Sequence, residues 1–162
     1  MNREAVRKII NAAVDKLYQK DGTVLRKEDD MQESTIIHRL AMYLEEYFQQ
    51  DGYVVDIEYS KMSRTYNGVC ENVGTLLVGK LSKSPIGAGK NDIYPDIVVH
   101  KRDTNDNLIE IEVSIAWRNS GKLHDLRKVN EYMKLLRYTH GVYVELAERI
   151  EDVKVRFGPF SI

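Results

Sequence analysis

Cysteine, long apolar runs and proline are scarce in this chain. Its single cysteine, Cys70, excludes an internal disulfide and a zinc site built from cysteines. The sequence has neither an apolar signal segment at its start nor a run of about 20 apolar residues. We therefore expect a cytoplasmic protein that makes no contact with a membrane.

An excess of charge of one sign is also missing. The chain has 24 basic and 25 acidic residues, so its overall charge gives no signal for nucleic-acid binding, and contacts to phosphate would have to come from a local patch. A chain of 162 residues with a hydrophobic fraction of 43% can bury about 70% of its unfolded surface. We expect residues 1–162 to form a single domain.

Within residues 108–116, apolar and polar side chains alternate strictly from Ile109 to Ile115. The polar positions are Glu110, Glu112 and Ser114. Successive side chains of a strand point to opposite faces, so these three residues share one face, and Ile109, Ile111, Val113 and Ile115 share the other. The pattern predicts a strand with an acidic row on one face.

A second predicted strand begins just after an aspartate, in Pro95-Asp96-Ile97-Val98-Val99-His100. Proline suits a strand start because it lacks an N–H, and the polar residues 101–107 predict a turn. If the two strands form a hairpin, Asp96 lies beside Glu110 and Glu112. Carboxylates with water and phosphate oxygens are the ligands that Mg²⁺ prefers. A strand with one solvated face has the same alternation, so the residues leave both interpretations open.

Helical and extended patterns follow one another along the rest of the chain. Apolar residues recur at helical spacing over 3–20, between Ser34 and Asp51-Gly52, and over 122–139, with Ser34 as the expected N-cap. Further strands are expected at 53–59 and 141–146, with an edge strand at 153–157. The helix at 122–139 between two strands predicts a right-handed crossover and a parallel pair. The expected fold class is α/β, with a mixed sheet covered by helices.

Residues 60–92 are interrupted by glycines and predict a long insertion with one strand or short helix. Within it, Gly87-Ala88-Gly89-Lys90 has some features of a phosphate-binding loop. Ser84 replaces the first glycine of that pattern and Asn91 replaces its final Ser or Thr. We interpret the segment as a mobile loop before the central strand.

Four short motifs connect the chain to a known superfamily. They are Glu33-Ser34, His38-Arg39-Leu40-Ala41, Glu58-Tyr59 and Pro95-Asp96-Ile97-Val98-Val99-His100. This ordered set, with the sequence of helices and strands around it, resembles the PD-(D/E)xK nuclease superfamily with its restriction-endonuclease-like fold. The resemblance extends from about Glu33 to Leu146. It implies that Asp96 and a glutamate of the next strand bind a divalent metal, and that Glu33 completes the acidic site.

The lysine of the superfamily's Glu-x-Lys motif is missing from residues 108–116. In one register Glu112 is the metal ligand and Ser114 stands where the lysine belongs; in the other, Glu110 is the ligand and Glu112 takes the lysine position. We favour the first. The lysine orients the attacking water and stabilises charge on the phosphate, which a serine hydroxyl would do weakly. Lys122, in the following helix, is a candidate to extend back to this site and take the place of the missing lysine.

The resemblance leads to two hypotheses for function. The first is a Mg²⁺- or Mn²⁺-dependent nuclease that hydrolyses DNA, with catalytic Glu33, Asp96, Glu112 and Ser114 and with Glu110 as an alternative metal ligand. The second is a catalytically inactive relative that binds nucleic acid or protein, suggested by the missing lysine and the balanced charge. The expected partner is nucleic acid, in the first instance DNA, and both hypotheses are compatible with a homodimer.

Overall fold

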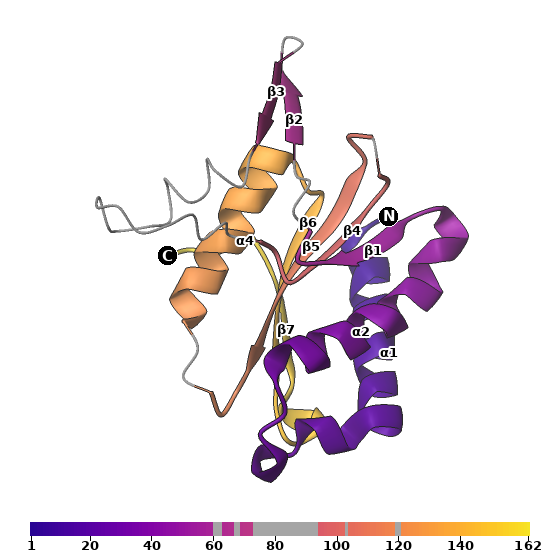
Figure 1. Cartoon of the computed structure of the whole chain (residues 1–162), viewed down its shortest axis with the longest axis vertical. Helices are drawn as coiled ribbons and strands as arrows, with labels where there is room; N and C mark the ends of the chain where they lie inside the picture. Colours follow the sequence, from indigo (N-terminus) through magenta and orange to yellow (C-terminus); the bar gives the residue numbers. More distant parts are fainter. Residues whose placement is uncertain (60–62, 67–68, 73–93, 103, 119–120) are drawn as a thin grey trace.

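A five-stranded β-sheet with helices on both faces is the framework of the structure (Figure 1). The computed structural model describes residues 1–59, 63–66, 69–72, 94–102, 104–118 and 121–162. In sheet order the strands are β1 (Val54–Ile57), β4 (Ile97–His100), β5 (Asn107–Ile115), β6 (His140–Leu146) and β7 (Lys154–Phe157). Only β5 and β6 are parallel neighbours within this sheet. The mixed α/β architecture expected from the sequence is confirmed.

Two helices, α1 (Arg3–Asp21) and α2 (Glu33–Phe48), cover one face of the sheet. Their apolar sides and the residues of the sheet that face them form the larger core, which includes Ile10, Leu17, Leu40, Ile111 and Val144. Short 3₁₀ turns at Gly22–Leu25 and Lys27–Asp29 connect the two helices.

The predicted N-cap of α2 is wrong by two residues. The helix begins at Glu33, and Gln32 is its N-cap. The carbonyl of Gln32 already accepts hydrogen bonds from the backbone N–H groups of Thr35 and Ile36. Helical geometry is therefore set before Ser34, and Glu33 lies in the first turn of the helix.

The opposite face of the sheet is covered by α4 (Lys122–Leu136), drawn in orange in Figure 1. The helix ends three residues earlier than predicted because Arg137 takes up the left-handed conformation, with φ of 57°. Where α4 crosses β6, a Cβ on Gly141 would come within 2.5 Å of Val129 and 2.6 Å of Met133. The glycine therefore permits the close approach of helix and sheet, which positions the α4 side chains over β5.

The segment predicted as an insertion contains two described strands. β2 (Ser63–Tyr66) and β3 (Val69–Asn72) pair as an antiparallel hairpin, where the sequence predicted one strand or a short helix. Gly87-Ala88-Gly89-Lys90 lies outside the described residues. None of the helices in the described part of the chain combines the length and the apolar character needed to span a bilayer.

Candidate functional site

The hairpin of β4 and β5 brings Asp96 next to the acidic row. The strands are antiparallel, with Ile97 opposite Ile111 and Val98 opposite Glu110. Asp96 immediately precedes β4, and its Oδ2 accepts a hydrogen bond of 2.7 Å from the backbone N–H of Val113. That bond holds the carboxylate of Asp96 beside Glu112, the residue that precedes Val113 in β5.

Glu110 and Glu112 are buried, with 0% and 1% of their surfaces exposed. They face α4, because alternate residues of β5 pack into the core formed with α1 and α2. The interpretation of the acidic row as a solvated strand face is therefore wrong for these two residues. The sequence pattern could not show this, since the helix that covers them follows later in the chain.

A lysine from α4 neutralises part of this buried charge. The Nζ of Lys128 donates to Oε2 of Glu112 at 2.6 Å, and only 8% of the lysine is exposed. Burial alone would lower the pKa of Lys128, but the attraction of Glu112, Asp96 and Glu110 outweighs it and raises that pKa. Lys128 is therefore charged, and it carries its charge into the acidic row of β5.

Two further carboxylates border the cluster. Glu33, at the start of α2, has its pKa raised by burial and by the nearby charge of Asp96. Asp125, one turn before Lys128 in α4, has its pKa raised by burial, with the attraction of Lys128 opposing the shift. The structure thus brings Glu33, Asp96 and Glu112 to one region.

Arg118 connects Glu33 to the loop that follows β5. Its guanidinium donates to the carbonyl of Met31 and, at 3.1 Å, to Oδ1 of Asp30, and it lies 4.0 Å from Oε2 of Glu33. These contacts hold the chain before α2 against the end of β5. The position of Glu33 relative to β5 therefore depends on a residue of that loop.

The two residues expected to compensate for the missing lysine are engaged elsewhere. The hydroxyl of Ser114 shares a buried hydrogen bond of 2.6 Å with that of Tyr143 on β6. Lys122 donates to Oε2 of Glu145, also at 2.6 Å, and does not pair with the acidic row. The prediction that Lys122 extends back to the acidic row is therefore wrong. The lysine of α4 that contacts this row is Lys128.

Three oxygens of the acidic row, Oε1 of Glu112 and both carboxyl oxygens of Glu110, accept no hydrogen bond from another type of residue. The side chains of Glu110 and Glu112 hydrogen-bond to each other. Burial raises the pKa of each of these glutamates, that of Glu112 with a further contribution from the charge of Asp96. Two buried carboxyl groups can hydrogen-bond to each other only if a proton lies between them, so this pair holds at least one proton.

The carboxylates of this cluster are not arranged around a single position that a metal ion could occupy. Within the described residues, no group of three or more His, Cys, Asp or Glu side chains is arranged to hold a metal ion. The ammonium of Lys128 lies among them instead. A divalent cation bound by Asp96 and Glu112 would therefore have to share the cluster with Lys128 or replace it there.

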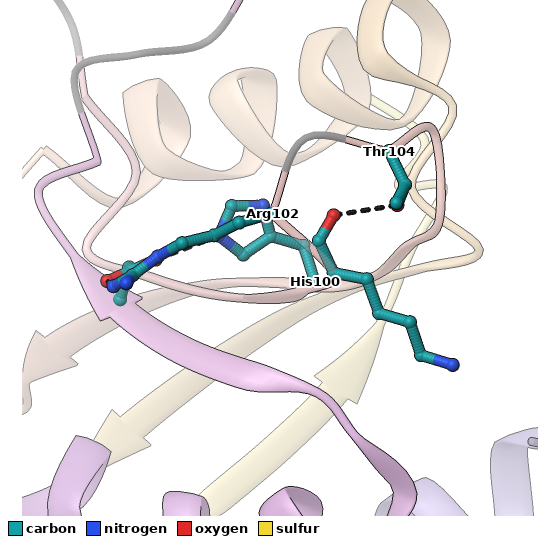
Figure 2. A network of polar contacts seen from close by, with 5 residues as sticks. His100, Arg102 and Thr104 are labelled. Carbon is teal, nitrogen blue, oxygen red and sulfur yellow. Dashed lines mark hydrogen bonds and ion pairs between the residues drawn. The ribbon is translucent and has the colours of Figure 1, made fainter.

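A second polar network lies at the other end of β4 (Figure 2). Nε2 of the buried His100 is 2.9 Å from Oδ2 of Asp56 on β1, and Arg102 pairs with the same carboxylate. The hydroxyl of Thr104 donates to the carbonyl of Lys101 at 2.7 Å. Because every polar group named here has its partner within the network, we assign it to holding the β4–β5 turn against β1.

Sequence reasoning missed Lys128, Asp125 and Arg118. Lys128 shares one side of α4 with the buried Tyr132 and Leu136, four and eight residues further on. A lysine at that spacing within an apolar side is the signal that could have indicated it.

No protein-family model matches this chain, and neither the curated proteins nor the solved structures gave a match.

Proposed function

We propose that this chain is a divalent-metal-dependent nuclease of the PD-(D/E)xK type that hydrolyses DNA phosphodiester bonds, with its lysine supplied by α4. The observation that carries the proposal is the 2.6 Å contact between Lys128 and Glu112 beside Asp96. It supplies the positive charge that the strand lacks, although Lys128 is 16 residues further along the chain.

Each side chain then has a distinct role. Asp96 and Glu112 would hold Mg²⁺ or Mn²⁺, which as a bound Lewis acid would activate the phosphate and the attacking water. Lys128 would stabilise negative charge developing on the phosphate, the role for which Ser114 was considered. Glu33 lies at the border of the cluster, where a half-buried carboxylate with a raised pKa can accept a proton from water.

Cleavage of supercoiled DNA with Mn²⁺ or Mg²⁺ tests the proposal. We expect Asp96→Asn and Glu112→Gln to abolish cleavage, and Lys128→Met to slow it about a hundredfold, the usual effect of removing one electrostatic contact to the reacting group. Lys122→Met is the matched control, because Lys122 is the other α4 lysine that pairs with a glutamate. Cleavage that survives Asp96→Asn would contradict this assignment of the site.

One observation favours the inactive alternative, a module that binds nucleic acid or protein. Glu112 is already paired with Lys128, and no group of three ligands is arranged for a metal in the described part of the chain. Under this alternative, Lys128 is only the structural counter-ion of a buried carboxylate. Absence of cleavage and of metal binding in the parent protein would support it.

A further inference from the structure

A groove of about 650 Å³ lies between α1 and the strand β7. One wall is a side of α1 that carries Arg7, Asn11 and Asp15, and the other is formed by residues between Ile150 and Arg156. Its volume is in the range of ligand-binding pockets. The groove shares no residue with the cluster around Glu112, so a role for it does not depend on the proposed nuclease activity.

The helix and the strand run side by side in opposite directions. Arg3 donates to the carbonyl of Gly158 and Arg7 to that of Val155, both at 3.1 Å. Later residues of α1 therefore lie beside earlier residues of β7. Asp15 follows Arg7 by two helical turns, about 12 Å. The groove thus has a cation toward one end and a carboxylate toward the other.

The backbone of β7 offers hydrogen bonds to the groove. β7 is the last strand in the sheet order that the described residues form. The carbonyl of Val155 points away from β6, since it accepts from Arg7 of α1. In an antiparallel strand the N–H and C=O of one residue point to the same side, so the N–H of Val155 also points toward the groove. An extended peptide can therefore pair with β7 as an added strand.

The spacing of side chains on this side of α1 matches that of a strand. Arg7, Asn11 and Asp15 follow one another at intervals of four residues, a rise of about 6 Å each. Alternate residues of a strand share a face and are about 6.6 Å apart. A strand added to β7 would thus place three successive side chains of one face opposite these residues. The matching groups are a carboxylate, a hydroxyl or amide, and an ammonium, in that order.

Arg7 determines which strands can pair with β7. An incoming strand that bonds to the carbonyl of Val155 must take it from the guanidinium of Arg7. A carboxylate on that strand gives the guanidinium a new acceptor. A strand without one leaves the half-buried guanidinium with one partner fewer, which costs stability.

We propose that the groove between α1 and β7 binds an extended protein segment in which an acidic residue is followed four residues later by a basic one. The segment pairs antiparallel to β7, which is the more stable type of strand pairing, and so runs in the direction of α1. Its acidic residue contacts Arg7 and its basic residue contacts Asp15.

Fluorescence anisotropy with two labelled peptides tests the order of the charges. The probe is Ser-Thr-Glu-Val-Thr-Val-Lys-Thr-Ser, and the control peptide has its glutamate and lysine exchanged, so composition and net charge stay the same. We expect the probe to bind about tenfold more tightly, because two exposed charge contacts are attractive in one order and repulsive in the other. Equal binding of the two peptides, or no binding of either at millimolar concentration, overturns the proposal.

The variant Asp15→Arg tests the contacts from the side of the protein. It leaves Arg7 on Val155 and changes an exposed residue, so the fold and the cover of the edge are kept. With a cation at both ends of the groove, the two peptides should bind equally. Asp51→Asn, at an exposed position outside the groove, should keep the tenfold preference of the parent. A preference that survives Asp15→Arg contradicts the assigned contacts.

Hydrogen exchange measured by NMR locates the bound peptide. The N–H of Val155 points into the groove, so we expect a saturating concentration of the probe to slow its exchange at least tenfold. Unchanged exchange of Val155 with bound probe shows that the peptide does not add to β7, and the proposal is then wrong. It is also wrong if a DNA duplex slows this exchange and the probe does not, because the groove is then a phosphate-binding surface.

Discussion

Ser114 illustrates how the surroundings of a residue decide what its position in a motif can do. It follows Glu112 by two residues, where the superfamily pattern has lysine, yet its hydroxyl is bonded to Tyr143 and only 3% of the residue is exposed. In the register with Glu112 as metal ligand, Ser114 takes the position of the lysine. The group at that position is therefore a neutral hydroxyl that already has a hydrogen-bond partner.

The substitution Ser114→Lys tests this interpretation. The sequence alone predicted that it would restore the motif and increase cleavage. The structure changes that expectation, because the new ammonium would be buried next to Tyr143 and Lys128 already supplies a charge. We expect cleavage not to rise and the free energy of unfolding, measured by urea denaturation, to fall by about 3 kcal/mol. Increased cleavage with unchanged stability would restore the strand-borne lysine as the correct model.

At the scale of elements, α4 is attached to the sheet at its first turn through Glu145. This residue of β6 accepts hydrogen bonds from Lys122 of α4 at 2.6 Å and from Lys154 of β7 at 2.7 Å. The two lysines lower the pKa of Glu145 from its ordinary value of 4.5 to about 2. One carboxylate thus links a helix and two strands.

The lowered pKa of Glu145 makes the stability of the fold depend on pH. A carboxyl with a lower pKa in the folded state contributes stability above its unfolded pKa and loses it as pH falls. The contribution should therefore be complete above pH 4.5 and disappear toward pH 2. Thermal unfolding followed across this range should show a smaller acid-induced loss in Glu145→Gln than in the parent. Glu4→Gln, at an exposed position of α1, should keep the acid sensitivity of the parent.

The sequence predicted the elements well because their signals are local. The strand at 97–99, the alternation at 108–116 and the crossover through α4 follow from side-chain periodicity, and the structure confirms them. Lys128 escaped prediction because its partner Glu112 belongs to another element. Which side of a helix faces which strand depends on packing. Leu123, for example, is one of the apolar residues at helical spacing in the predicted helix 122–139, yet it is exposed. The metal, the substrate and the choice between Glu110 and Glu112 stay predictions.

For the whole molecule, the edge of the sheet at β7, the last strand in the order that the described residues form, is a surface that needs protection. Edge strands present unpaired backbone groups that can pair with another chain. Arg7 of α1 donates to the carbonyl of Val155 and Arg3 to that of Gly158, both at 3.1 Å. Their guanidinium groups also lie over the ring of Phe157. Two arginines one turn apart therefore cover this edge.

Removing the second of these arginines should promote self-association. In Arg7→Ala the carbonyl of Val155 loses its donor and the ring of Phe157 becomes less covered, so β7 can pair with a second copy. We expect sedimentation velocity to show dimers or larger species that increase with protein concentration. The control Arg26→Ala changes an exposed arginine between α1 and α2. If the parent and Arg7→Ala sediment alike at every concentration, the arginines do not protect this edge.

The pairing of Lys128 with Glu112 also bears on the order of folding. β4 and β5 are joined by a short turn and can associate early, whereas β6 joins β5 only after the chain has crossed through α4. Until α4 docks, Glu110 and Glu112 remain hydrated and ionised. Docking removes that water, and the helix delivers the required counter-charge itself. If α4 docked one residue out of register, Lys128 would be rotated by about 100° away from Glu112. The buried glutamates would then lose their counter-charge, so the native register of the helix is more stable than the shifted one.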